Sequence, residues 1–212
     1  MQKPEIIYVG DPLCSWCWGA APELSLLKER FKAQMDFKIL LGGLRPGTNT
    51  VMSDHQKLFL KKHWLEIESL TGQKFNYQIL ERHDFIYDTE PPARAVFCMR
   101  AINPDLEFDF FKAIQKAFYV ENKNTNSLET YLDICEEFFM ERDIFEKLFF
   151  TEDAQSGTLD DFEQTRMLGV MGFPTVLLKI GEKYKLITRG YEKYEAMEQK
   201  LLVWLNTLVN NG

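Results

Sequence analysis

Two cysteines, Cys14 and Cys17, are the residues whose types and spacing point most directly to chemistry. Two thiols at this spacing can close a disulfide on one helical turn and reopen it. The thiolate is the attacking form, and a helix N-terminus stabilises it through unpaired N–H groups and the helix dipole. The spacing therefore predicts Cys14 as the exposed nucleophile and Cys17, deeper on the same turn, as the resolving thiol.

The surrounding sequence predicts that these cysteines open a helix between two strands. Residues 5–10 form a short apolar run, residues 15–31 have apolar side chains at helical spacing with a kink expected at Pro22, and residues 37–41 read as a second strand. Strand, helix and strand with short connections imply a parallel pair with a right-handed crossover. Cys14 is then placed directly after a strand and at the start of a helix.

The rest of the chain is predicted as a helical middle followed by a return to strands. Ser53 with Gln56 resembles a capping box. The predicted elements are 53–72, 91–103, 106–120, 127–139, 143–150, 154–168 and 191–209 as helices, and 175–180 and 184–188 as strands. The sum is an α/β fold, in which residues 1–48 and 152–212 form one small mixed sheet with its helices and residues 49–151 are an all-helical insertion.

The composition argues against two classes of partner. The 212 residues carry a net charge of −7, and nucleic acid needs a basic face. No apolar run approaches the roughly 20 residues of a membrane span. The first residues show no leader pattern, so if Met1 is the native start the protein is expected in the cytoplasm, where a CxxC pair is catalytic or metal-binding. Monomer and homodimer both stay open.

No metal site is expected. Zinc needs four ligands at suitable spacing, and the chain has one CxxC pair. The histidines, His55, His63 and His83, follow no ligand pattern and are expected on helix surfaces or in loops. Cys98 and Cys135 lie in separate predicted helices and are expected to be structural, because buried cysteines on apolar stripes are usually inert.

The residues between and after the cysteine pair are uncharged and partly aromatic. Ser15 and Trp16 supply no cation that would assist thiolate formation. Trp16 and Trp18 predict an aromatic rim suited to an extended apolar peptide or an aromatic small molecule. The alternative for either tryptophan is an ordinary place in the core.

Two motifs of this chain resemble those of a known family. They are Asp11-Pro12-Leu13-Cys14-Ser15-Trp16-Cys17-Trp18-Gly19 and, before a later strand, Gly172-Phe173-Pro174-Thr175. Together they resemble the DsbA-type thiol–disulfide oxidoreductases of the thioredoxin-like superfamily. The most similar branch is the cytoplasmic FrnE-like one, whose members are often described as candidate protein disulfide isomerases. The resemblance covers essentially the full length.

The resemblance implies a thioredoxin-like fold with a helical insertion, a redox-active Cys14–Cys17 disulfide and no bound cofactor. The implied partners are thiol- or disulfide-containing proteins or small molecules, with glutathione as a possible co-substrate. In the family the proline matching Pro174 is cis and faces the CxxC pair. Phe173 would then offer its backbone to the substrate, Pro174 would keep metal from the thiols, and Thr175 would complete the wall. A trans proline that starts a strand is the alternative.

The chain departs from the wider superfamily at the position six residues before the first cysteine. A buried carboxylate often stands there, whereas this chain has Tyr8, which is a poor base near neutral pH. Asp11 is nearer and could relay a proton, could disfavour the Cys14 thiolate by repulsion, or could simply form an Asp-Pro turn. Arg94, in the insertion, could hold a substrate carboxylate or glutathione, with an ion pair on the surface as the alternative.

The sequence predicts a thiol–disulfide oxidoreductase, with a disulfide isomerase as a narrower form of that function. One alternative is a glutathione-dependent isomerase or kappa-type glutathione transferase on the same fold. Those enzymes usually carry serine at the nucleophile turn, whereas both cysteines are present here. A second alternative is a redox-inert peptide-binding module. The direction of any exchange stays open.

Overall fold

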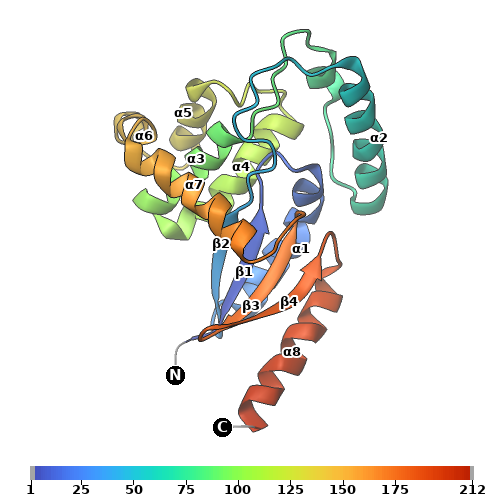
Figure 1. The fold of residues 1–212 in the computed structure, drawn as a ribbon, viewed down its shortest axis with the longest axis vertical. Coiled ribbons are helices and arrows are strands. Elements are labelled where there is room, and N and C mark those ends of the chain that lie inside the picture. The colour runs from blue at the N-terminus through green and yellow to red at the C-terminus, as the bar shows by residue number, and fades with distance from the viewer. Residues whose placement is uncertain (1–2, 211–212) are drawn as a thin grey trace.

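The sheet of this protein joins the two ends of the chain. The computed structural model describes residues 3–210, and its four strands lie in the order β2-β1-β3-β4 (Figure 1). β1 runs parallel to β2 and antiparallel to β3, and β4 is antiparallel to β3. The strands are β1 (Glu5–Gly10), β2 (Asp36–Leu41), β3 (Thr175–Ile180) and β4 (Lys183–Arg189). The predicted mixed sheet is confirmed. The outermost positions of its predicted domain, 1–2 and 211–212, lie outside the described residues.

β1 is one of the two inner strands, and all six of its residues are buried. Its side chains alternate between the two faces of the sheet, as the strand period requires. Ile6 and Tyr8 join the large core cluster that contains α1 (Ser15–Phe31), whereas Ile7 and Val9 join a smaller cluster on the other face. Burial on both faces explains why this strand reads as a continuous apolar run.

The insertion lies over the end of the sheet at which β1 stops (Figure 1). Ser53 and Gln56 form the predicted capping box, since Ser53 Oγ accepts from Gln56 N at 3.3 Å and Gln56 Oε1 accepts from Ser53 N at 2.9 Å. The helices of the insertion are α2 (Asp54–Thr71), α3 (Glu90–Ile102), α4 (Glu107–Tyr119), α5 (Leu128–Glu137) and α6 (Arg142–Phe149). Each lies within about two residues of its predicted bounds.

The hydrophobic core runs across the predicted border between sheet and insertion. One cluster holds Ile6 and Leu24 together with Phe110 and Phe145 from the insertion. A second cluster joins Leu13, next to the cysteine pair, to aromatic side chains of α2 and α4. The division at residues 49–151 stays a prediction, and the two parts share buried apolar contacts at Leu13, the residue before Cys14.

The C-terminal segment contains α7 (Glu152–Met167), the hairpin of β3 and β4, and α8 (Tyr194–Asn210). Ile180 pairs with Lys183, so the hairpin turns at Gly181, whose φ of +57° favours glycine. Over residues 3–210, no helix is both long enough and apolar enough to span a bilayer.

The start of α8 was predicted three residues too early, at residue 191. Glu23 of α1 explains the difference, because its carboxylate accepts from the Tyr191 hydroxyl, from Lys193 Nζ and from the Tyr194 backbone N–H at 2.9–3.2 Å. The carboxylate satisfies a free N–H at the helix start and holds the preceding residues outside the helix. This cap comes from 171 positions away and leaves no local signal.

Candidate active site

Cys14 is the N-cap residue of α1 and has an extended backbone, with φ −79° and ψ 117°. Its N–H donates to Asp11 O at 3.0 Å, and its carbonyl accepts from Trp18 N at 3.1 Å, which starts the helix. The Cys14 side chain makes no capping bond, and within the first turn of α1 no side chain is acidic. Cys14 therefore lies at the positive end of the helix dipole, beside the N–H groups of a first turn that carries no carboxylate.

The wall opposite Cys14 is the loop that enters β3. The peptide bond between Phe173 and Pro174 is cis, and Cys14 Sγ donates to Phe173 O at 3.6 Å. Thr175 is buried, and its hydroxyl donates to Gly172 O at 2.8 Å. The structure thus brings Cys14, Phe173, Pro174 and Thr175 together, although 159 positions separate Cys14 from Phe173.

Gly42, at the end of β2, makes room for that wall. An added Cβ at Gly42 would lie 2.3 Å from the Phe173 ring, closer than any real contact. The Phe173 side chain therefore packs directly over the Gly42 backbone. The Pro174 carbonyl accepts from Gly190 N at 2.7 Å, which ties the loop to the end of β4.

The two thiols differ in burial. Cys14 is 7% exposed and Cys17 is fully buried, and both are free thiols in this structure. Burial raises the pKa of the Cys17 thiol, and the neighbouring Cys14 raises it further. Cys14 is thus the thiol that a substrate can reach, and Cys17 lies behind it.

Asp11 holds the turn before the cysteine pair. Its side chain is buried, and its two oxygens accept from Leu13 N at 2.9 Å and from Leu44 N at 2.7 Å. Burial raises the pKa of Asp11 to about 6, against these two N–H groups, which lower it. The contact with Leu13 is local, as expected for the predicted Asp-Pro turn, whereas the contact with Leu44 ties the turn to the loop after β2. A proton-relay role stays a prediction.

Tyr8 lies under the turn, with its hydroxyl buried. Burial raises the pKa of Tyr8, and the nearby Cys17 raises it further. The hydroxyl therefore stays protonated and can donate a hydrogen bond, but it cannot act as a base at neutral pH. Tyr8 and Asp11 are the two candidates for tuning the pKa values of the cysteine pair. Asp11 can carry a charge near neutral pH, whereas Tyr8 cannot.

Two tyrosines that the sequence reading missed hold the residue before Cys14. Tyr119, at the end of α4, donates to Leu13 O at 2.5 Å, and Tyr87 donates to the same oxygen. Both side chains are buried. Burial is the main cause that raises the pKa of each hydroxyl, and the nearby Cys14 raises it further. Their only signal in the sequence is aromatic character, which the core explains equally well. The insertion thus supplies two donors to the active-site turn.

The two tryptophans have different surroundings. Trp18 stacks on Tyr119, with ring centroids 6.0 Å apart and planes at 12°, and its Nε1 donates to Lys74 O at 3.0 Å. Trp16 lies beside Tyr191, with ring centroids 6.3 Å apart. Trp18 is therefore fastened to the insertion, and Trp16 is the half-buried aromatic side chain nearer the C-terminal segment. A substrate-binding role for either stays a prediction.

Arg94 is engaged within the insertion. Its guanidinium pairs with Glu90 at 3.0 Å, donates to Phe149 O at 3.3 Å and lies 4.3 Å from the centre of the Phe149 ring. The ion pair suggested as an alternative was expected on the surface, but the Arg94 side chain is only 13% exposed, so the pair is largely buried.

Cys98 and Cys135 are fully buried, and burial raises the pKa of each to about 12.

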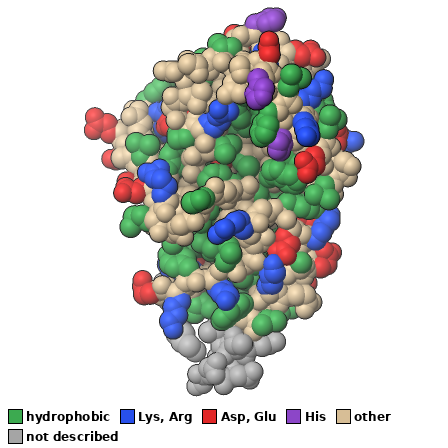
Figure 2. All heavy atoms as spheres, turned by 45° about the vertical axis from the view of Figure 1, so that its right-hand side comes forward, with side chains coloured by type: hydrophobic (Ala, Val, Ile, Leu, Met, Phe, Trp, Pro, Cys, Tyr) green, Lys and Arg blue, Asp and Glu red, His purple; other side chains and the backbone are tan. Residues whose placement is uncertain are grey.

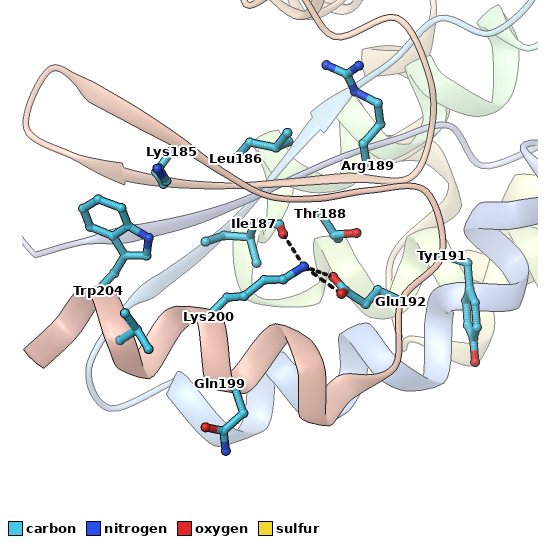
Figure 3. A pocket seen from close by; sticks show the side chains of 11 residues that line it. Lys185, Leu186, Ile187, Thr188, Arg189, Tyr191, Glu192, Gln199, Lys200 and Trp204 are labelled. Atoms are coloured by element: carbon cyan, nitrogen blue, oxygen red, sulfur yellow. Dashed lines mark hydrogen bonds and ion pairs between the residues drawn. The ribbon is translucent and has the colours of Figure 1, made fainter.

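Other surface features do not converge on a second reactive site. The histidines, purple in Figure 2, lie on the upper part of the molecule, and among the described residues no three His, Cys, Asp or Glu side chains group as metal ligands. A cavity of about 750 Å³ lies between β4 and α8 (Figure 3). Lys200 crosses it and donates to Ile187 O at 3.0 Å and to the Glu192 carboxylate at 2.7 Å, and its described lining includes no cysteine.

Comparison with known proteins agrees with this geometry. A family model described as thioredoxin matches residues 7–199. This chain belongs to the thioredoxin family. A solved structure from Nitrosomonas europaea, described as a candidate protein disulfide isomerase, is 34% identical, with a TM-score of 0.92 over 97% of this chain and 99% of that one. The predicted resemblance to DsbA-type oxidoreductases is confirmed, and the FrnE-like branch stays a prediction.

Two more relatives of this thioredoxin-family chain have other descriptions. The cytosolic disulfide reductase DsbM from Pseudomonas aeruginosa, solved with GSH, is 25% identical, with a TM-score of 0.77 over 97% of this chain and 99% of that one. The ClpXP adapter protein SpxH from Bacillus subtilis (strain 168) is 23% identical over 179 residues. That match takes in 82% of this chain and 58% of the adapter, so the chain spans less than two thirds of the curated relative it matches.

Proposed function

We propose that this member of the thioredoxin family is a thiol–disulfide oxidoreductase that works through Cys14 and Cys17. One observation carries the proposal: the Cys14 thiol stands at a helix N-terminus, 3.6 Å from the carbonyl that precedes a cis proline. A thiolate at that position is stabilised by the helix and is open to an incoming disulfide. The second thiol lies behind it on the same turn.

In the reducing direction, exchange takes two steps. The Cys14 thiolate attacks one sulfur of a substrate disulfide, the new mixed disulfide forms, the substrate S–S bond breaks, and the other sulfur leaves as a thiolate that takes a proton. Cys17 then loses its proton and attacks Cys14 Sγ. The Cys14–Cys17 bond forms, the mixed disulfide breaks, and the second substrate thiolate leaves and is protonated. Two electrons pass from the cysteine pair to the substrate, and oxidation is the reverse.

The proposed substrate wall is the backbone of Phe173, Pro174 and Thr175. An extended segment beside this loop would pair with the backbone of Phe173 as an added strand, and would replace the Cys14 thiol on the Phe173 carbonyl. Trp16 would supply apolar contact area at the same mouth. The proposed substrates are thiol- or disulfide-containing proteins or small molecules, and glutathione is the proposed reducing co-substrate, supported by the DsbM relative solved with GSH. A cytoplasmic location belongs to the proposal, and the description of DsbM as cytosolic supports it.

Insulin reduction by the purified protein tests the proposal. Wild type should reduce insulin with glutathione as electron donor, and Cys14→Ser should reduce the rate to background because the attacking sulfur is gone. Cys135→Ser is the matched control, since its thiol is buried in α5 away from the turn, and it should keep the wild-type rate. Retention of exchange by Cys14→Ser would disprove the assignment.

A redox titration of the pair against glutathione sets the direction. A potential far below that of the glutathione pool indicates a reductase, and one well above it indicates an oxidant. Ring isomerisation of an aromatic substrate without any dithiol activity would favour the glutathione-dependent isomerase instead. Peptide binding with no insulin reduction would favour a redox-inert module, which the match to an adapter protein makes worth testing.

A further inference from the structure

Tyr8 carries a hydroxyl that the fold holds rigidly beside the resolving cysteine. Its ring packs against Phe37, Phe108 and Phe111, with ring centroids 5.5–6.4 Å apart. The hydroxyl end lies over Gly10, where an added Cβ would come within 2.4 Å of the oxygen. The aromatic core on one side and bare backbone on the other therefore fix the position of this hydroxyl.

The Tyr8 hydroxyl is an unused donor. Within the described residues no acceptor meets it at hydrogen-bond geometry, and the side chain is fully buried. A buried polar group without a partner costs about 1–3 kcal/mol. Such a group is unusual in a folded protein and calls for an explanation, such as an acceptor that appears only during a reaction.

Cys17 becomes such an acceptor when it ionises. Its thiolate is required for the resolving step, and burial raises the pKa of the thiol and so makes that thiolate costly. Tyr8 and Cys17 are buried in the same core cluster, and the Tyr8 hydroxyl and the Asp11 backbone N–H each act to lower the pKa of the Cys17 thiol, against the effect of burial. The oxygens of the Asp11 carboxylate already accept from Leu13 N and Leu44 N, so this group is committed to the turn.

We propose that the Tyr8 hydroxyl donates a hydrogen bond to the Cys17 thiolate during the resolving step, in a chain that has no carboxylate at this position. The inference rests on the proposed function and adds a catalytic residue to it. The Tyr8 hydroxyl without an acceptor and the Cys17 thiolate without a donor are each unfavourable in a buried site. A hydrogen bond between them satisfies both groups once the thiolate forms. The donor is already in place, so little reorganisation accompanies the step.

Tyr8 keeps its own proton throughout this step. Cys17 loses its proton, which is balanced by the proton that the leaving substrate sulfur takes up, and the Cys17 thiolate attacks Cys14 Sγ. The Cys14–Cys17 bond forms, the bond between Cys14 and the substrate breaks, and the substrate sulfur leaves with the electron pair and takes a proton from solvent. Tyr8 lowers the barrier by stabilising the attacking anion before its charge moves to the leaving sulfur.

The test measures the two steps of exchange separately in Tyr8→Phe, which deletes only the hydroxyl. Attack is measured with a disulfide peptide in a Cys17→Ser background, where only the first step occurs. Resolution is measured as release of peptide from the mixed disulfide in single turnover. Loss of one hydrogen bond to a buried charge should slow release about 10- to 100-fold and shift its pH profile upward, with the attack rate unchanged.

Tyr131→Phe is the matched control, because its buried hydroxyl donates to Thr125 O within the insertion. It should leave both steps at the wild-type rate. Fluorotyrosine at position 8 is the second variant, since it keeps the ring and makes the hydroxyl a stronger donor. Release should then be faster than in wild type, and this readout survives if Tyr8→Phe fails to fold.

The outcomes separate this inference from the proposed function. If Tyr8→Phe releases peptide at the wild-type rate, or slows attack and release equally, the hydroxyl has no specific role at Cys17 and the inference is overturned. If wild type forms no mixed disulfide at all, the proposed function fails first. Selective slowing of release, with faster release from the fluorotyrosine protein, supports the inference.

Discussion

The two sulfurs of the active-site turn stand three residues apart in surroundings of opposite kinds. The Cys14 side is built from backbone: N–H groups at the start of α1 and the Phe173 carbonyl, with a small exposed fraction. The Cys17 side is built from buried side chains, with Tyr8 above an aromatic core. The start of the helix would stabilise the attacking thiolate of the proposed mechanism, whereas burial makes a thiolate at Cys17 costly. The difference supports the proposed roles, in which Cys14 attacks and Cys17 resolves on a single helical turn.

The insertion takes part on both sides of this comparison. Tyr87 and Tyr119 donate to the carbonyl of Leu13, next to Cys14, whereas Phe108 and Phe111 of α4 pack against Tyr8, next to Cys17. The helices that interrupt the sheet are therefore part of the structure around the two thiols. Loss of these contacts is expected to change the rates of the steps carried out by Cys14 and Cys17.

The largest expected effect comes from removing the Cys17 side altogether. Cys17→Ser leaves attack by Cys14 intact but removes the resolving thiol, so a mixed disulfide with the substrate should accumulate. In a single turnover of the pre-reduced protein without added thiol, release of reduced insulin should fall by at least about 10³-fold, as expected when a group used in every cycle is lost. Mass spectrometry of the trapped adduct checks this. A Cys17→Ser protein that turns over normally would contradict the division of roles.

The next effect concerns Asp11, which supports both sides through its backbone and its carboxylate. Its pKa of about 6 in the folded protein lies above the value of about 3.9 for an unfolded chain. Between these values the unfolded chain releases the proton first as pH rises, so the free energy of unfolding should fall from about pH 4 to pH 6, by about 3 kcal/mol.

Urea unfolding of wild type and Asp11→Asn across this range isolates the Asp11 contribution. Other carboxylates titrate in both proteins, so the difference between the two curves is the informative quantity. The stability of wild type relative to Asp11→Asn should be greatest at low pH and should decrease through about pH 6. A difference that does not change with pH would contradict the raised pKa.

The smallest of the three effects is at Leu13, on the Cys14 side. The double variant Tyr87→Phe with Tyr119→Phe removes both hydroxyl donors from the buried Leu13 carbonyl. This loss should lower the free energy of unfolding by about 1–3 kcal/mol. Each single variant should cost less, because one donor remains. The attack step should slow while release keeps its rate, the reverse of the pattern expected for Tyr8→Phe. Equal slowing of both steps would remove the contrast between the two sides.

The elements that the sequence predicted well are those with local causes. Periodicity and caps placed β1, α1 and α2 to within a residue, because the capping box of Ser53 and the apolar run of residues 5–10 are read from neighbours. The start of α8 was misplaced because its cap, Glu23, belongs to another helix. The pairing of Tyr87 and Tyr119 with Leu13 spans 74 and 106 positions, and no pattern of residues announces it.

The sequence by itself determined the two thiols, their place at the start of a helix, and the family to which the chain belongs. Helical spacing and turn chemistry act over a few residues, so these features are visible without a fold. Only the tertiary structure supplied the extent to which each sulfur is buried, the contact between Cys14 Sγ and the Phe173 carbonyl, and the buried Tyr8 hydroxyl, which has no hydrogen-bond partner among the described residues. Burial and hydrogen-bond satisfaction depend on groups brought together from distant parts of the chain, and these set the energy of a thiolate.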